Sequence, residues 1–208
     1  MHSILSSITK VNHLVLFDFD GTITNRDSLK DFLFFYHGWV KVWLGFIVLS
    51  PILALFVVRV IPNHSAKQIL LRYFFGKEPL VVFNARCKDF ATQHIPKIIR
   101  TGALKQINQH LSNRETVVVV SASPENWVKP WCESMGLLCL ATRLEAKDNK
   151  ITGNYSGNNC YGDEKVRRIK EKFNLSEFKA IIAYGDSRGD REMLELSNIK
   201  NYKPFQST

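Results

Sequence analysis

The sequence predicts an α/β fold in which a parallel, Rossmann-like sheet lies between two layers of helices. Short apolar runs typical of buried strands alternate with segments whose apolar residues recur at helical spacing. This order favours parallel strands joined by helical crossovers. In addition, the long stretch between the first and second apolar runs is helical in character, which predicts a small α-helical domain inserted into the core.

The predicted elements follow one another in a regular order. Each strand is a short apolar run, and each helix repeats apolar residues every three or four positions. A polar stretch with Asn and Gly turn signals, residues 143–155, predicts a hairpin beside the sheet. The predicted strands are 14–17, 116–121, 137–141 and 180–184, and the predicted helices are 97–111, 125–135, 164–173 and 188–196.

The chain divides into two predicted domains. Residues 1–27 and 97–208 form the α/β core, and residues 28–96 form the helical domain. In open α/β sheets a ligand binds outside the carboxyl ends of the strands. Because the insertion leaves the first strand at that edge, we expect it to roof the site and to choose the substrate.

Composition narrows the classes of partner. Lys and Arg number 28 against 19 Asp and Glu, for a net charge of +9, which indicates an anionic partner. A nucleic acid is not expected, because no stripe of Lys and Arg interleaved with aromatic residues lies near the predicted site. The four cysteines form no CxxC pair, and the stretch before the first strand has no sustained apolar core. We therefore expect a cytoplasmic protein with reduced thiols.

Two aspartates follow the first apolar run. Asp18 and Asp20 stand one residue apart, directly before Gly21 and Thr22, which indicate a turn. Side chains two residues apart on a strand point to the same face, so the carboxyls of Asp18 and Asp20 are both expected to reach one ligand. Their repulsion favours a cation between them or a proton on one of them. A turn aspartate beside a helix cap explains the same residues, so this segment alone leaves both interpretations open.

Further polar residues end strands or begin helices. Ser121 and Ala122 follow the second apolar run, where a hydroxyl suits a phosphate oxygen or a helix cap. Lys165 opens a helix, a position that its charge disfavours unless an anion lies nearby. Asp186 and Asp190 stand four residues apart after the last predicted strand.

In this order, the motifs resemble those of the haloacid dehalogenase superfamily of aspartate-nucleophile phosphatases. The DxDGT motif matches from Asp18, the serine motif at Ser121, the lysine motif at Lys165 and the GDSxxD motif from Gly185 to Asp190. The insertion resembles the C1 cap of the phosphoserine-phosphatase-like branch, subfamily IB.

This resemblance implies a role for each residue. Asp18 is the nucleophile that forms an aspartyl-phosphate, Asp20 is the general acid and base, and Lys165 stabilises charge. Asp18, the carbonyl of Asp20, and Asp186 hold Mg²⁺. The substrate or its phosphate is bound by Ser121, Ala122, Gly21 and Asp27, while Asp190 and Ser187 orient the ligands of the metal.

An uncharged apolar run, residues 42–58, distinguishes the insertion. Its length is near the lower limit for a membrane span, but one crossing would separate Asp18 from Ser121. Pro51 is expected to break a helix, which predicts two short apolar helices that turn at Ser50 and Pro51. These helices either enter one leaflet or pack inside the cap. Neighbouring basic residues favour peripheral contact with an anionic membrane through residues 39–61, on its cytoplasmic face.

The leading hypothesis is therefore a Mg²⁺-dependent phosphomonoesterase that acts on a lipid-linked or amphiphilic phosphate. The arrangement resembles the branch that includes bacterial phosphatidylglycerophosphatase C. Phosphoserine phosphatases usually carry Glu nine residues after the nucleophile, where this chain has Asp27, a departure that weakens the case for phosphoserine. The alternatives are a soluble phosphatase of small metabolites and a non-catalytic phosphate-binding protein.

Overall fold

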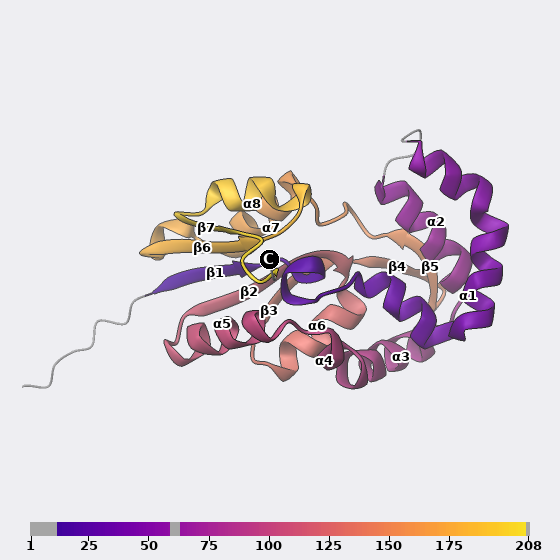
Figure 1. Ribbon diagram of the computed structural model, residues 1–208, viewed down its shortest axis with the longest axis horizontal. Coiled ribbons are helices and arrows are strands. Elements are labelled where there is room, and N and C mark those ends of the chain that lie inside the picture. Colours follow the sequence, from indigo (N-terminus) through magenta and orange to yellow (C-terminus); the bar gives the residue numbers. More distant parts are fainter. Residues whose placement is uncertain (1–11, 59–62, 207–208) are drawn as a thin grey trace, which may run out of the picture.

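The computed structural model describes residues 12–58 and 63–206, and its centre is a parallel sheet of five strands (Figure 1). The strand order is β3-β2-β1-β6-β7, and every neighbouring pair is parallel. The predicted fold class is confirmed. The strands are β1 (His13–Phe17), β2 (Thr116–Pro124), β3 (Leu138–Thr142), β6 (Ala180–Gly185) and β7 (Ile199–Tyr202).

Alternating side chains on the strands bury both faces of the sheet. Val15 and Phe17 of β1 contribute to a core with α5 (Thr101–Ser112) and α6 (Glu125–Ser134). Leu14 and Leu16 contribute to a second core with α7 (Asp163–Lys172) and α8 (Arg191–Leu196). In Figure 1, α5 and α6 lie below the sheet, and α7 and α8 lie above it. The three-layer arrangement thus follows from the two-residue period of the strands.

The register of the central strands brings their carboxyl ends together. Phe17, the last residue of β1, pairs with Val119 of β2 and with Tyr184 of β6. The residues that follow these strand ends therefore meet at one edge, as expected for a parallel sheet. Beyond Ser121 the pairing of β2 with β3 shifts register, and β2 runs on to Pro124.

Two elements differ from the prediction. Instead of one helix over 97–111, the structure has α4 (Ile95–Ile98) and α5, because Ile99 forms a bridge with Thr24 and the N–H of Arg100 bonds to the carbonyl of Ile23 at 2.8 Å. The edge strand β7 was not predicted. It is short and largely polar, and only its pairing with β6 makes it a strand.

The insertion between β1 and β2 contains α1 (Ser28–Val57), α2 (Asn63–Phe75) and α3 (Leu80–Gln93). Its packed centre is aromatic: the Phe32 ring contacts those of Phe75, Phe83 and Phe90, and stacks on Trp127 of α6. The insertion thus shares its core with the α/β layers. The boundaries of the two domains stay a prediction.

The predicted hairpin is present, as β4 (Leu144–Lys147) and β5 (Lys150–Tyr155) in antiparallel pairing. It forms a separate two-stranded sheet that packs against α2. A Cβ at Gly153 would lie 2.3 Å from the Cα of Arg72, so only glycine permits this approach.

The prediction that α1 turns at Ser50 and Pro51 is wrong. The helix continues through Pro51 to Val57, and its break lies at Gly38, where φ is 73° and ψ is 169°. Pro51 removes one hydrogen bond, to Ile47, but both residues lie on the exposed side, where the helix can open without disturbing packed side chains. At Gly38 the positive φ itself ends the helical path, and glycine adopts it at low cost.

By length and composition, one helix among the described residues could cross a membrane. It is the part of α1 from Ser28 to Ile52, of which 28% is buried inside the protein. Core helices of soluble proteins and signal sequences can have the same length and apolar composition, so these two properties do not decide whether the helix lies in a membrane.

Candidate active site

Asp18 is the first residue after β1, and its backbone N–H bonds to the carbonyl of Tyr184 at 2.9 Å. Its side chain is buried. The strand ends there, because residues Phe19–Ile23 form a single π-helical turn, η1. The expectation that strand alternation aligns Asp18 with Asp20 is therefore wrong, and the turn sets the positions of the two side chains.

Lys165 crosses from α7 and ends against Asp18. Its Nζ donates to Oδ1 of Asp18 at 2.6 Å, to Oδ1 of Asp190 at 2.6 Å and to the carbonyl of Val120 at 2.7 Å. An ammonium group has three hydrogens to donate, so these contacts satisfy it completely. The lysine is 1% exposed. Its position at the start of α7 is explained by the two carboxylates that it meets.

The charges of this group are strongly coupled. Burial raises the pKa of Asp18 to about 8, although Lys165 acts in the opposite direction. Burial also disfavours the charge of Lys165, but Asp18 and Asp190 outweigh it and hold the pKa of the lysine above its ordinary value. Likewise Lys165 outweighs burial at Asp190 and lowers the pKa of that carboxyl. A cation beside Asp18 would favour its ionised form.

Asp190 also arranges the loop that follows β6. Its Oδ2 accepts hydrogen bonds from the N–H of Ser187 at 2.9 Å, the hydroxyl of Ser187 at 2.7 Å and the N–H of Asp186 at 3.2 Å. Asp186 in turn accepts from Thr22 at 3.1 Å and from Gln206 at 3.2 Å. Asp190 and Ser187 therefore hold Asp186 in place through the backbone.

A cation could be held by oxygen atoms of Asp18, Asp186 and Asp190, which lie within 4.8 Å of one another. Carboxylate oxygens are the ligands that Mg²⁺ prefers, so this set fits the expected metal. It contains the predicted ligands Asp18 and Asp186, whereas Asp190 was predicted to orient the ligands and the third ligand was predicted to be the carbonyl of Asp20. The carboxylate of Asp20 has different partners. Its Oδ1 accepts the N–H of Ser28 at 2.7 Å, and its Oδ2 accepts the hydroxyl of Ser123.

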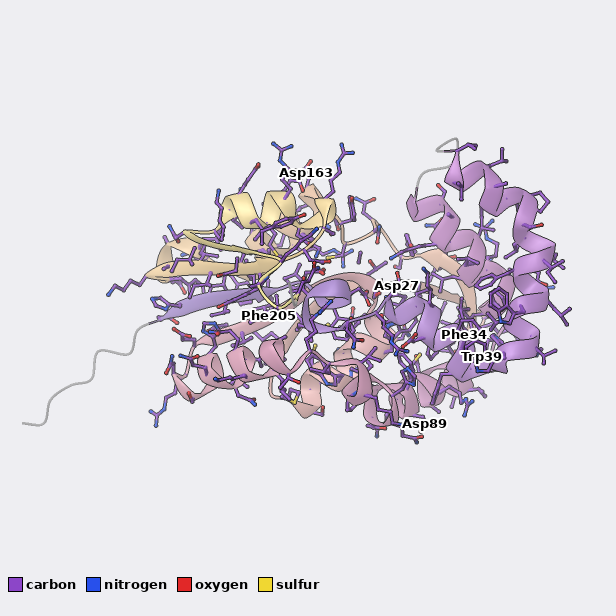
Figure 2. The ribbon with its side chains drawn as sticks, viewed as in Figure 1. Asp27, Phe34, Trp39, Asp89, Asp163 and Phe205 are labelled. Atoms are coloured by element: carbon purple, nitrogen blue, oxygen red, sulfur yellow. The ribbon has the colours of Figure 1, made fainter. Side chains whose placement is uncertain are left out.

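The predicted phosphate ligands lie around the same edge. Ser121 is buried, and its Oγ accepts the N–H of Ser123 at 3.0 Å, which leaves its own hydrogen to donate. The carbonyl of Ala122 accepts the hydroxyl of Thr142 at 3.0 Å. Asp27 directly precedes α1, where its Oδ1 accepts the N–H of Lys30 at 3.1 Å, and Figure 2 shows it between the sheet and the insertion. Whether these residues bind substrate stays a prediction.

Several residues of the site were missed by the sequence analysis. Arg100 donates from Nε to the carbonyls of Gly21 and Thr24, both at 3.2 Å, and so fastens the η1 turn. Gln206 lies beyond the last predicted element, and no local pattern marks it. Trp127 was counted only as an apolar position of a helix, although its N–H reaches the polar group around Asp20.

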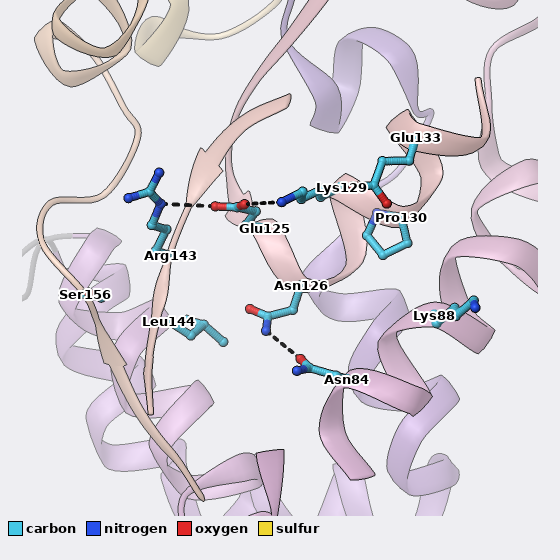
Figure 3. Close-up of a pocket in the computed structure, with 10 residues that line it drawn as sticks. All are labelled: Asn84, Lys88, Glu125, Asn126, Lys129, Pro130, Glu133, Arg143, Leu144 and Ser156. Atoms are coloured by element: carbon cyan, nitrogen blue, oxygen red, sulfur yellow. Dashed lines mark hydrogen bonds and ion pairs between the residues drawn. The ribbon is translucent and has the colours of Figure 1, made fainter. Parts of the chain in front are cut away.

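A pocket of about 540 Å³ lies apart from these residues, between α3, α6 and the hairpin (Figure 3). Glu125 pairs there with Arg143 at 3.3 Å and with Lys129 at 3.4 Å. Asn126 donates to Asn84 at 2.8 Å. The residues that line this pocket include none of the predicted site residues, so we assign it no part in the chemistry.

Comparison with known proteins identifies the class of the molecule as a phosphatase of the phosphoserine-phosphatase-like type. The chain belongs to the haloacid dehalogenase-like hydrolase family, which it matches over residues 15–195. The resemblance inferred from the motifs is thereby confirmed.

Individual relatives and one solved structure match most of the chain. Protein CicA of Caulobacter vibrioides is 33% identical over 93% of this chain and 86% of its own length. A phosphoserine phosphatase of Methanocaldococcus jannaschii is 27% identical over 92% of this chain and 85% of its own. A crystal structure of a Bordetella pertussis protein of unknown function has a TM-score of 0.77 at 22% identity and covers 90% of this chain and 87% of that one.

Proposed function

We propose that the protein is a Mg²⁺-dependent phosphomonoesterase that forms an aspartyl-phosphate and acts on a lipid-linked or amphiphilic phosphate, such as phosphatidylglycerophosphate. Two observations support it. The position of Lys165 between Asp18 and Asp190 supports the chemistry. The exposed apolar side of α1, which carries the proposal for the substrate, supports contact with lipid.

In the first step, an oxygen of Asp18 forms a bond to phosphorus while the ester bond to the leaving oxygen breaks and Asp20 gives that oxygen a proton. In the second, a water molecule attacks phosphorus, Asp20 takes its proton, and Asp18 is released. Lys165 and the hydroxyl of Ser121 stabilise the phosphate oxygens. When bound, Mg²⁺ offsets the repulsion between Asp18 and the phosphate dianion.

The apolar face of α1 consists of large side chains that are between 44% and 76% exposed. Positions such as Val42 and Leu49 are buried instead, and α1 packs against α2, so the helix has one packed side and one open side. Figure 2 shows Phe34 beside Trp39 in the lower part of the insertion, and their ring centroids are 4.5 Å apart. The members of the apolar face are Trp39, Val40, Trp43, Leu44, Ile47, Val48, Leu55 and Val57 of α1, and Val58, which directly follows the helix.

A contiguous apolar surface of this kind favours a lipid partner, and the exposed Lys41 beside it favours an anionic membrane. We place the protein at the cytoplasmic face of such a membrane, in contact through residues 39–61. Residues 59–61 of that segment lie outside the described residues. The substrate of a membrane-bound phosphatase is then a phosphate carried by the lipid itself.

The test compares phosphate release from phosphatidylglycerophosphate in anionic liposomes with release from phosphoserine in solution. We expect the lipid to be the better substrate, Ile47→Asp to abolish co-flotation with the liposomes and Asp18→Asn to abolish turnover. Val81→Asp is the matched control, because Val81 is 80% exposed but belongs to α3 and not to α1. Failure to hydrolyse the lipid, together with failure to bind liposomes, contradicts the lipid assignment.

A soluble phosphatase of small metabolites is the second candidate, supported by the phosphoserine phosphatase among the relatives. Preferential hydrolysis of phosphoserine would favour it. Binding of phosphate compounds without turnover by the wild-type chain would instead favour the third candidate, a phosphate-binding protein.

A further inference from the structure

Three side chains form a line of hydrogen bonds that ends at Asp20. The indole Nε1 of Trp127 donates to Oγ of Ser28 at 3.1 Å. The hydroxyl of Ser28 donates to Oγ of Ser123 at 3.1 Å, and the hydroxyl of Ser123 donates to Oδ2 of Asp20. Trp127, Ser28 and Ser123 are each no more than 1% exposed.

The direction of this line is set by chemistry. An indole N–H can only donate, so Ser28 must accept from Trp127 and has its own hydrogen left for Ser123. Ser123 accepts that bond and therefore has its hydrogen left for Asp20. Because burial keeps water from offering other partners, the tryptophan fixes the orientation of both hydroxyls.

The line joins three parts of the fold. Trp127 belongs to α6, Ser123 to the end of β2 and Ser28 to the first turn of α1. The indole ring stacks on Phe32, with centroids 4.6 Å apart and an angle of 27° between the planes. The N–H of Ser28 also holds Oδ1 of Asp20, so both carboxylate oxygens are positioned where the insertion meets the core.

We propose that Trp127 is a positioning residue for Asp20 and acts through Ser28 and Ser123. The proposal rests on the function given above, in which Asp20 transfers the proton. Each oxygen of Asp20 accepts one protein hydrogen bond and keeps a second lone pair, so the proton that the carboxyl carries can point at the leaving oxygen. Loss of the indole N–H would free both hydroxyls to rotate and let the carboxyl turn away.

The leaving group of the substrate provides the test. The 4-nitrophenolate ion leaves phosphorus without a proton, whereas the more basic phenolate ion needs one from Asp20. We therefore compare kcat/KM, which reports formation of the phospho-enzyme, for 4-nitrophenyl phosphate and for phenyl phosphate. For Trp127→Phe we expect a loss of about tenfold with phenyl phosphate and less than about twofold with 4-nitrophenyl phosphate, a part of the full effect of a general acid.

A second readout comes from the hydrolysis of the phospho-enzyme, in which Asp20 takes a proton from water. With 4-nitrophenyl phosphate as the substrate, slower hydrolysis of the phospho-enzyme should lower kcat and KM of Trp127→Phe by the same factor, so that kcat/KM stays unchanged. Ser28→Ala, which keeps the backbone N–H to Asp20, should show the same selective loss and replaces Trp127→Phe if that variant does not fold. Trp131→Phe is the matched control. Trp131 is also a buried tryptophan of α6, and its ring packs against the ring of Phe19.

An equal loss of kcat/KM with both substrates, or no loss with either, would overturn the proposal, because a merely structural residue does not sense the leaving group. Its failure can be told from failure of the proposed function. If Asp18→Asn keeps the activity of the wild-type protein on both aryl phosphates, the nucleophile is wrong, whatever Trp127 does.

Discussion

Gly21 and Asp186 approach each other so closely that a side chain at position 21 would displace the carboxylate of Asp186. A Cβ on Gly21 would lie 2.4 Å from Oδ2 of Asp186, and the φ of Gly21 is +88°. The glycine of the η1 turn and the carboxylate after β6 are therefore matched parts of one site, although the sequence places them far apart.

The variant Gly21→Ala should lose activity on the order of 100-fold, because a shift of about 1 Å in a catalytic group has that effect. The positive φ adds about 1–2 kcal/mol of strain to the folded state. Phosphatase assays and urea unfolding measure the two effects. Gly136→Ala is the control: its φ is +70°, but a Cβ there meets nothing within 4 Å. It should lose stability alone, and equal loss of activity in both variants would contradict the account.

Removal of Lys165 should destabilise the protein more than an ordinary core substitution. Lys165→Met leaves the carboxylates of Asp18 and Asp190 buried without a counter-charge, which costs about 3–5 kcal/mol. Urea unfolding in the presence of a chelator measures this loss. Added Mg²⁺ should restore part of the stability by replacing the positive charge, although activity stays low. Unchanged stability of Lys165→Met would show that the three groups do not form a charged cluster.

The metal assignment predicts that a chelator stops turnover and that Mg²⁺ restores it. Asp186→Asn should raise the Mg²⁺ concentration that gives half-maximal rate by on the order of 10- to 100-fold. Thr22→Val removes only the hydroxyl that bonds to Asp186, so it should raise this half-maximal Mg²⁺ concentration by a smaller factor. Titration of activity with Mg²⁺ provides the comparison. A chelator-resistant rate in the wild-type protein would contradict a divalent cation held by Asp18, the carbonyl of Asp20 and Asp186.

Glu164 should make the stability depend on pH. Its hydrogen bonds with Arg167, helped by those with Arg168 and Asn158, lower the pKa of its carboxyl from 4.5 to about 2. Because the folded pKa lies below the unfolded one, the stabilisation is fully present above about pH 4.5 and is lost as the pH falls to about 2.

The test is the free energy of urea unfolding at pH 7 and at pH 3. Glu164→Gln should be less stable than the wild-type protein by about 1–2 kcal/mol at pH 7, and the difference should shrink at pH 3. Glu171→Gln is the control, since Glu171 also pairs with Arg167 but is largely exposed. A difference that does not change with pH would remove Glu164 as its source.

Features of local origin could be predicted from the sequence. The apolar runs became β1, β2, β3 and β6 within a few residues, because a strand buried on both faces needs a continuous apolar sequence. Asp18 and Asp186 were predicted as neighbours because residues after parallel strands meet at one edge. Lys165, which opens a helix, was added to them by the resemblance to the phosphatase family. The effect of Pro51 was predicted wrongly, because the rule that proline breaks a helix considers the local sequence alone. It does not say whether the proline lies on an exposed side of the helix, where the lost hydrogen bond can be tolerated.

Partners distant in sequence were decided by tertiary structure alone. Gln206, Arg100 and Trp127 carry no motif, and their roles arise only because folding brings their donors within reach of Asp186, Gly21 and Ser28. The sequence by itself determined the order of the catalytic motifs along the chain, the signs of their charges and the residue types that lie at the sheet edge. Packing decided which atoms of those residues bond, because hydrogen-bond direction and side-chain rotation depend on neighbours that no local pattern contains.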